Sequence, residues 1–337
     1  MKKLKIGLVG CGAIAEFQMD ALMKVEAAEL KAVCDMRLDL AEAMAKKYGV
    51  AEIYTDYAEM LKSDIEAVII CTPNFAHCPN AIDGARAKKH LLVQKPFAMD
   101  MDEAERMVSA AKENGIIMQA AFFERFCGSL QKLDEIIHSG EIGRPLVIRT
   151  QMSHTGIDKF WHPKTEWFHD KKKSGGGPLG DLGAHHYDVI RWLSRSDPET
   201  VSASTQSLLE NGIEDNASIT LKMKNGMMAQ CFMSFTTVGP KNYAYERIEI
   251  YCEEGTVIYN ASANGAPGKI LMTKKDSIDF VEVPYENVDP WVGLESHFVD
   301  CVLNHKTPVT TGEDGKICLN IIKKGYASAE SGKVMKL

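Results

Sequence analysis

The sequence lacks paired cysteines and long apolar runs. Its nine cysteines are scattered, and no Cys-x-x-Cys pair occurs. An odd number of scattered cysteines, several of them in apolar stretches, is typical of a reducing compartment and not of a disulfide framework or a zinc site. The apolar runs are far shorter than the roughly 18 residues of a membrane-spanning helix, and the N-terminus lacks a signal-peptide segment. We therefore expect a cytoplasmic protein that enters no membrane.

Basic charge and metal-binding motifs are also scarce. The chain has 39 Lys and Arg against 46 Asp and Glu, a formal net charge of −7. Nucleic acids and anionic membranes bind basic surfaces, so neither is expected as a partner. Five histidines fall between residues 154 and 186, yet there is no H-E-x-x-H motif and no close Cys/His spacing. The sequence therefore predicts no metal site.

What is present is the composition of a globular protein with room for two domains: 337 residues, 45% hydrophobic and 25% charged. Over the first 120 residues, short apolar runs alternate with amphipathic segments. Strands are expected at 5–10, 30–35, 67–71, 90–94 and 116–120, and helices at 14–25, 38–48, 76–88 and 102–114. This alternation predicts an α/β Rossmann domain, whose parallel strands all end at one ligand-binding edge.

Beyond about residue 126 the pattern changes. A helix is expected at 129–139, an extended run at 145–153, and a helix at 185–193 after a glycine-rich segment, 174–183. Strands are then expected at 217–223, 227–236, 247–252, 255–260 and 269–273, followed by helices at 295–304 and 312–331. Consecutive strands with tight turns predict an α+β domain with a large open, mostly antiparallel sheet.

These patterns place a Rossmann NAD-binding domain at 1–123 and a domain for substrate binding and oligomerisation at 124–337. The last helix is expected to pack back on the first domain. Because an open sheet with alternating apolar residues needs both faces covered, we expect a homodimer or homotetramer.

A dinucleotide-binding turn occupies residues 10–15, GCGAIA, which fit G-x-G-x-x-G/A between an expected strand and an expected helix. Gly10 permits the tight turn, Gly12 lets the backbone approach a pyrophosphate, and Ala15 keeps the helix close to the sheet. The pyrophosphate would lie at the positive end of the helix dipole. The residues expected to bind cofactor here are Gly10, Gly12, Ala13, Ile14 and Ala15.

Asp35 ends the second expected strand, about 20 residues beyond the turn, where an acidic residue accepts the adenosine ribose hydroxyls. A carboxylate at that place would repel a 2′-phosphate, so NAD is predicted in preference to NADP. Arg37 lies two residues further on and could contact a phosphate, which would weaken that preference.

Three further segments follow strands or open a helix: Cys71-Thr72-Pro73-Asn74-Phe75-Ala76-His77, Gln94-Lys95-Pro96, and 175–188 with the sequence GGGPLGDLGAHHYD. With the glycine turn and the TGEDG segment at 311–315, their order and spacing resemble the Gfo/Idh/MocA family, which includes glucose–fructose oxidoreductase and inositol dehydrogenase. The resemblance extends over nearly the whole chain.

The resemblance implies roles for individual residues. Lys95 would lie beside the nicotinamide and the reacting carbon, while Asp181 and His185 would form an acid/base pair on one helix face. The remaining residues expected at the nicotinamide end are Cys71, Thr72, Pro73, Asn74, His77, Gln94 and Pro96. The family usually has Glu where this chain has Gln94, so Lys95 is expected to lose a neighbouring negative charge and to be easier to deprotonate.

The chemistry of alcohol oxidation requires a base for the hydroxyl proton and a cation near the developing alkoxide. His185 titrates near neutrality and suits the first role, whereas Lys95 could fill either, so the sequence leaves the proton acceptor open. The substrate is expected to be a sugar, an inositol or a sugar derivative. Four further candidate contacts, with core packing as the alternative for the tryptophans, are Arg125, Trp161, His162 and Trp167.

Two other functions remain open at this stage. A redox-neutral enzyme would keep NAD tightly bound and use transient oxidation to hydrolyse a glycoside or to catalyse an elimination. A non-catalytic sensor would bind NAD without needing Lys95 or His185. The hydride-transferring dehydrogenase is favoured over both, because the chain carries a complete cofactor motif together with acid/base residues.

Overall fold

The structure of the chain is a computed structural model that describes residues 2–163, 165–209, 212–239, 243–262 and 268–337. In this described part the N-terminal sheet has six parallel strands in the order β3-β2-β1-β4-β5-β6. The strands are β1 (Leu4–Val9), β2 (Ala28–Cys34), β3 (Glu52–Tyr54), β4 (Ala67–Ile70), β5 (His90–Val93) and β6 (Met118–Ala120). The order reverses between β1 and β4, and a crevice at such a switch point is where open parallel sheets bind ligands.

Helices alternate with these strands and have identifiable ends. They are α1 (Ala13–Leu22), α2 (Leu38–Tyr48), α3 (Tyr57–Leu61), η1 (Asn74–Ala76), α4 (His77–Arg86) and α5 (Met101–Asn114). Asp56 and Asp100 accept backbone N–H bonds as the N-caps of α3 and α5, and Gly49 and Gly115 end α2 and α5 in the left-handed conformation. The parallel Rossmann domain predicted from the sequence is confirmed.

The second sheet has nine strands within the described ranges, in the order β14-β13-β12-β11-β7-β10-β9-β8-β15. Its strands are β7 (Pro145–His154), β8 (Pro198–Gln206), β9 (Asn216–Met223), β10 (Met228–Ser234), β11 (Ala244–Cys252), β12 (Gly255–Ser262), β13 (Lys269–Lys274), β14 (Val281–Val283) and β15 (Met335–Lys336). Only β7 and β10 pair in parallel among these strands. The large, mostly antiparallel sheet predicted from the sequence is therefore confirmed.

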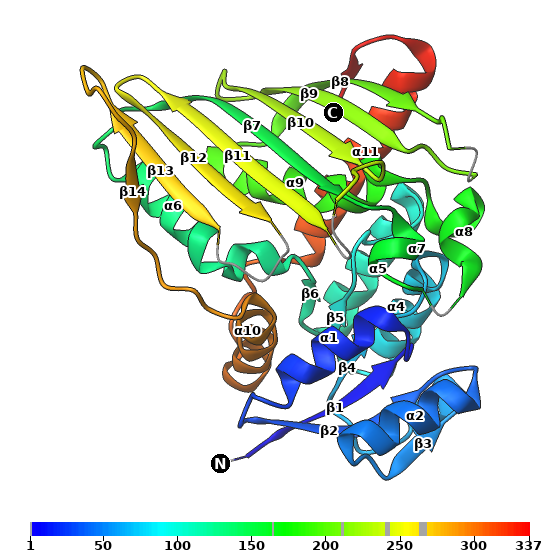
Figure 1. Ribbon diagram of the computed structural model, residues 1–337. Coiled ribbons are helices and arrows are strands. Elements are labelled where there is room, and N and C mark those ends of the chain that lie inside the picture. The colour runs from blue at the N-terminus through cyan, green and yellow to red at the C-terminus, as the bar shows by residue number, and fades with distance from the viewer. Residues whose placement is uncertain (1, 164, 210–211, 240–242, 263–267) are drawn as a thin grey trace.

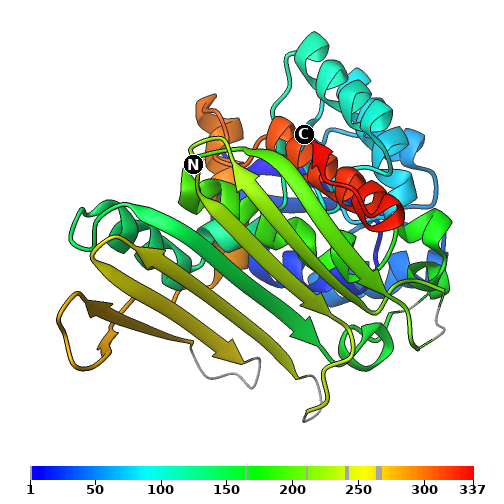
Figure 2. The same cartoon turned by 90° about the horizontal axis from the view of Figure 1, so that it is seen from above.

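Helices cover one face of this second sheet, while the opposite face carries no described helix in either view (Figures 1 and 2). The covering helices are α6 (Gly128–His138), α9 (Pro178–Ser194) and α11 (Gly312–Ser331). Short helices connect β7 to α9: α7 (Ile157–Phe160), η3 (Glu166–His169) and α8 (Lys171–Ser174). None of the described helices is long and apolar enough to cross a membrane.

The two sheets are joined by elements that contact both. The helix η2 (Phe123–Phe126) follows β6 and meets α9, α10 (Pro290–Asn304) packs on α1, and α11 lies against α5 as well as β8. Two chain segments from the C-terminal end thus return to the N-terminal sheet, which fixes its ligand-binding edge against the second sheet (Figure 1).

Several features differ from the sequence-based expectation, and the strands β8, β14 and β15 were not among those expected. The short elements β3 and α3 were not expected, because three- and five-residue segments leave little periodic signal. The helix α9 begins at Pro178 and not at 185, so it contains Gly180 and Gly183. A β-carbon at Gly183 would lie 2.5 Å from the Tyr187 hydroxyl, so the glycine permits close packing that outweighs its poor helix propensity.

Candidate active site

A cavity of about 810 Å3 runs along the carboxyl edge of the N-terminal sheet, where strands β1, β2, β4 and β5 end. The sequence-predicted residues that line it are Gly10, Gly12, Ala13, Ile14, Asp35, Arg37, Cys71, Thr72, Pro73, Asn74, His77, Gln94, Lys95, Trp161, Trp167, Asp181 and His185. These residues come from both halves of the chain. The sequence motifs thus converge on one cavity.

The glycine turn forms one end of this cavity. Gly10 has a φ of +88°, and a β-carbon there would lie 2.6 Å from the carbonyl carbon of Cys71, so only glycine fits between the two loops. Gly12 is the N-cap of α1 and has open space where a β-carbon would lie. Because no side chain caps this helix in the described structure, its first N–H groups remain available to an anion.

The side chain of Asp35 lies at the cavity beside the glycine turn. Its carboxylate accepts hydrogen bonds from the backbone N–H groups of Cys11, at 2.8 Å, and Arg37, at 2.9 Å. The Arg37 guanidinium donates to the Asp39 carboxylate, with Nη2 to Oδ2 at 2.7 Å. A fixed carboxylate thus lines this part of the cavity, and Arg37, two residues away in the chain, has an anionic partner of its own.

These residues fit a nicotinamide dinucleotide. The uncapped N-terminus of α1 and the open space at Gly12 would hold a pyrophosphate, and Asp35 would accept the adenosine ribose hydroxyls. When bound, nicotinamide supplies hydride transfer. The residues at the other end of the cavity decide what the protein contributes to that chemistry.

His77 ties together the two loops that carry the nicotinamide-end residues. It is buried, and its ring nitrogens lie 2.9 Å from the carbonyl oxygens of Pro96 and Thr72. Burial lowers the pKa of His77 against the effect of these hydrogen bonds. Asn74 donates to the carbonyl of Ser174 at 2.6 Å and so links the same loop to the segment before α9. His77 and Asn74 therefore position the loops.

Lys95 and Asp181 form an ion pair at the reacting end, with Nζ and Oδ1 2.5 Å apart and both side chains 11% exposed. Burial alone would raise the pKa of Asp181, but the Lys95 ammonium beside it keeps that pKa below its ordinary value. Gln94 brings no negative charge to Lys95, as expected, but Asp181 supplies a counter-ion from α9. Gln94 instead accepts a hydrogen bond from the Lys95 backbone N–H at 3.2 Å.

His185 lies one helical turn beyond Asp181 on α9, and its ring lines the same cavity. Its Nδ1 atom lies 2.8 Å from Oε2 of the buried Glu124, while the ring of Phe123 packs edge-on with centroids 5.1 Å apart. With Nδ1 occupied by the carboxylate, Nε2 is the nitrogen that remains for a ligand in the cavity.

His154 at the end of β7 lines the cavity too, although the sequence did not single it out as a site residue. Its ring is stacked between Phe160 and Phe235, and its Nδ1 accepts a hydrogen bond from the Gly156 N–H at 3.1 Å. Burial lowers the pKa of His154 to about 4, so the ring is neutral and carries its hydrogen on Nε2. His154 can therefore donate a hydrogen bond, whereas His185 can accept one.

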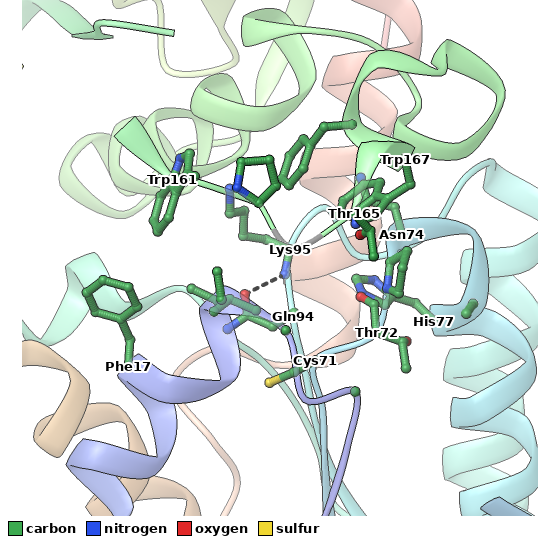
Figure 3. Close-up of a pocket in the computed structure, with 18 of the residues that line it drawn as sticks. Phe17, Cys71, Thr72, Asn74, His77, Gln94, Lys95, Trp161, Thr165 and Trp167 are labelled. Atoms are coloured by element: carbon green, nitrogen blue, oxygen red, sulfur yellow. Dashed lines mark hydrogen bonds between the residues drawn. The ribbon is translucent and has the colours of Figure 1, made fainter. Parts of the chain in front are cut away.

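Aromatic side chains from both halves of the chain border Lys95. In Figure 3, Phe17 and Trp161 lie on one side of Lys95 and Trp167 lies on the other. The Phe17 and Trp161 rings meet edge-on at 5.9 Å, and Phe17 also lies 6.2 Å from Trp291. Flat apolar rings of this kind pack against the C–H faces of cyclic ligands.

Arg125 and His162 lie outside the cavity lining, so the geometry does not support their expected roles as substrate contacts. Arg125 is committed to a buried ion pair with Asp188, with nitrogen–oxygen distances of 2.7 and 2.6 Å. His162 is exposed. Ala15 and Pro96 are buried outside the cavity lining as well, which fits supporting roles, Ala15 in helix–sheet packing and Pro96 in accepting from His77.

Sequence reasoning missed Glu124, His154, Phe17 and Trp291. Glu124 follows the end of β6 by four residues, near the carboxyl edge of the parallel sheet, and this position was a usable signal. Phe17 lies on α1, the helix that follows the glycine turn, whereas His154 and Trp291 reach the cavity only through the docking of β7 and α10, which the local sequence does not encode. In the described residues, no group of three or more His, Cys, Asp and Glu side chains is arranged to hold a metal ion.

Comparisons with known proteins agree with this architecture. Residues 4–122 match the family profile described as an oxidoreductase family with an NAD-binding Rossmann fold, and residues 130–258 match the Gfo/Idh/MocA C-terminal domain. An uncharacterized oxidoreductase of Rhizobium meliloti is 31% identical over 236 residues, 69% of each chain. Myo-inositol 2-dehydrogenase of Thermotoga maritima is 27% identical over 341 residues, 97% of this chain and 96% of the relative.

Solved structures show the same fold. The aldose-aldose oxidoreductase from Caulobacter crescentus superposes with a TM-score of 0.89 at 21% identity, and the match covers 100% of each chain. At that identity the likeness concerns the fold alone. From the two family matches and the curated relatives, this chain belongs to the Gfo/Idh/MocA family of NAD-binding oxidoreductases.

Proposed function

We propose that the chain is a dehydrogenase that interconverts a secondary hydroxyl and a ketone on a sugar, an inositol or a sugar derivative, with NAD in preference to NADP. The observation that carries the proposal is the convergence of the Lys95–Asp181 ion pair and His185 at one end of the dinucleotide cavity. A relative that matches nearly the whole chain is named myo-inositol 2-dehydrogenase, which favours a cyclic polyol as the substrate.

In this proposal the two basic residues have different tasks. Lys95 donates to Asp181 and is the cation that hydrogen-bonds the substrate oxygen and stabilises its developing negative charge. His185 accepts the hydroxyl proton at Nε2, because its Nδ1 is occupied by Glu124. Asp181 holds the lysine in place, and the Nε2–H of His154 is available to a second substrate hydroxyl.

The preference for NAD rests on the charges at the adenosine end. The Asp35 carboxylate would repel a 2′-phosphate, and Arg37 is engaged by Asp39. Incubating the protein with NAD or NADP and a panel of aldoses, inositols, sugar acids and glycosides, and following reduced cofactor by absorbance, tests both the reaction and the preference. Equal efficiency with both cofactors would remove the preference and leave the reaction standing.

The same panel separates the other two functions. A redox-neutral glycoside-cleaving enzyme would release product with no net reduced cofactor, and a sensor would bind NAD but leave every substrate unchanged. We favour neither, because the Lys95–Asp181 ion pair and His185 border the end of the cavity where we propose that the reacting hydroxyl binds.

We further propose that two or four copies associate through the open face of the second sheet. Leu146, Met228 and Phe232 expose apolar side chains on β7 and β10 at 39–50% of their full accessibility, and burying such a face stabilises assembly. Light scattering that finds only monomers would contradict this.

We also propose the cytoplasm as the compartment of the protein. The buried free thiols of Cys34, Cys71 and Cys78 suit its reducing conditions.

A further inference from the structure

Glu124 lies directly behind the cavity, in contact with the histidine that the proposed function uses as base. Its side chain is 2% exposed, and its Oε2 atom lies 2.8 Å from Nδ1 of His185. Its second oxygen, Oε1, is buried and has no hydrogen-bond partner among the described residues. A carboxylate buried in this way is costly unless a neighbouring group compensates for its charge, and His185 is the side chain that its Oε2 atom contacts.

The position of Glu124 is fixed by its neighbour in the chain. The Arg125 guanidinium donates two hydrogen bonds to the Asp188 carboxylate, of 2.7 and 2.6 Å, and a third to the carbonyl of Val309 at 2.8 Å. His185 and Asp188 are three residues apart and lie on one face of α9. Consecutive residues of η2 therefore contact two positions on the same face of α9, and the bonds of Arg125 anchor the backbone that carries Glu124.

The contact determines which ring nitrogen can act as a base. A carboxylate only accepts hydrogen bonds, so Nδ1 of His185 carries the hydrogen and Nε2 keeps its lone pair. Although burial opposes ionisation of Glu124, the nearby His185 and His186 rings keep its pKa below the ordinary value, so it is a carboxylate at neutral pH. When Nε2 takes a proton, the imidazolium gains an adjacent counter-charge.

We infer that Glu124 is a positioning residue, which holds His185 in the tautomer with a basic Nε2 and stabilises the protonated ring that forms during alcohol oxidation. This inference rests on the proposed function. In the oxidation, the O–H bond of the substrate breaks and its proton bonds to Nε2 of His185. The C–H bond on the carbon that bears this oxygen breaks as well, and its hydride goes to the NAD of the proposed function.

Other titratable groups surround the pair, and the test has to separate their effects. Those packed near Glu124, His185 or Asp181 are Lys95, Cys127, His154 and His186. The substitution Glu124→Gln removes one negative charge and lets a donor face Nδ1, while these groups stay in place. Loss of the anion makes His185 harder to protonate, so the acidic limb of the pH–kcat/KM profile moves to lower pH.

The chain offers a matched control, because His186 forms an equivalent pair with Glu246, Nε2 to Oε1 at 3.2 Å, outside the cavity lining. We expect Glu124→Gln to lower kcat with myo-inositol, or with the best substrate of the panel, by on the order of 10²-fold or more. The binding constant of NADH should be unchanged. Glu246→Gln should leave kcat and the acidic limb unchanged, and Glu124→Asp, which keeps the carboxylate, should recover part of kcat.

The wild-type protein carries a second test that needs no substrate. In the full-length chain labelled with nitrogen-15 histidine, the His185 signal, assigned by its loss in His185→Gln, should show Nδ1 protonated and Nε2 unprotonated at neutral pH. In Glu124→Gln this signal should change tautomer or titrate at lower pH. A reversed tautomer in the wild type, or wild-type kcat and pH profile in a folded Glu124→Gln, would overturn the inference. Absence of turnover and of NADH binding in the wild type would instead overturn the proposed function.

Discussion

Replacing Lys95 with Met should destabilise the protein at neutral pH more than at acidic pH. The substitution keeps an unbranched side chain of similar length but leaves the Asp181 carboxylate, 11% exposed and 2.5 Å from Nζ in the wild type, without its counter-ion. Breaking a buried ion pair by removing one partner costs about 3–5 kcal/mol. An unfolding entropy of about 2.1 cal/mol/K per residue gives about 1.4 °C per kcal/mol for 337 residues, so the expected fall in Tm is roughly 4–7 °C.

The pH dependence follows from the pKa of Asp181, which Lys95 keeps below its ordinary value. A carboxyl whose pKa is lowered by folding stabilises the protein above its unfolded-state pKa, and that stability is lost as the pH falls through the folded pKa. In Lys95→Met, burial without a cation favours the neutral acid. The loss of Tm should therefore be largest near neutrality and shrink as the pH falls towards and below about 4, because the variant carboxyl takes up its proton above its ordinary pKa and the wild-type carboxyl below it.

A double-mutant cycle isolates the pair from other effects of the substitution. Calorimetric melts of wild type, Lys95→Met, Asp181→Asn and the double variant should give a coupling of roughly 1–3 kcal/mol at neutral pH. The double variant should be more stable than Lys95→Met alone, because no unpaired charge remains. Additive losses, or the same loss of Tm at both pH values, would refute the electrostatic reasoning.

Three further predictions follow from the geometry. Asp35→Ala should raise kcat/KM with NADPH relative to NADH, because the repelling carboxylate is removed, and steady-state kinetics with both cofactors measure the ratio. Gly10→Ala should lower Tm or prevent folding, because its β-carbon would collide with the backbone of Cys71. Gly12→Val should melt like the wild type, because its side chain would enter open space, yet it should lose NADH binding in fluorescence titrations. Burial lowers the pKa of His186, but contacts with Cys231 and Glu246 outweigh burial and raise that pKa to about 10. Glu246→Gln should therefore lower Tm most below about pH 6.5, with the loss fading as the pH rises from there towards about 10.

The sequence predicted the N-terminal half of the site well because its parts are local. A strand, a glycine turn and a helix occupy consecutive residues, and the loops after β4 and β5 meet at the carboxyl edge of any parallel sheet. Lys95 could therefore be placed beside the glycine turn without the structure. The family resemblance pointed to Asp181 and His185, and their spacing of four residues puts them on one face of α9, which starts seven residues earlier than expected.

The partners of these residues could not be predicted in the same way. Glu124 contacts His185 across 61 residues of chain, and Arg125 pairs with Asp188 across 63. Nothing in the local pattern distinguishes an arginine that binds substrate from one that joins two domains. The same holds for Gln94, whose missing charge is supplied by Asp181 from another domain. Side-chain pairings of this kind depend on how the two sheets dock.

The central claim is that the protein moves a hydride between NAD and a polyol with Lys95 and His185 at the reacting end, and one comparison tests it most directly. Wild type, Lys95→Met and His185→Gln are incubated with NAD and myo-inositol or the best substrate of the panel, and reduced cofactor is followed by fluorescence while NADH binding is titrated on the same samples. We predict turnover by the wild type and losses of at least about 10²-fold in both variants with NADH binding retained. Wild-type turnover in either variant would contradict the claim.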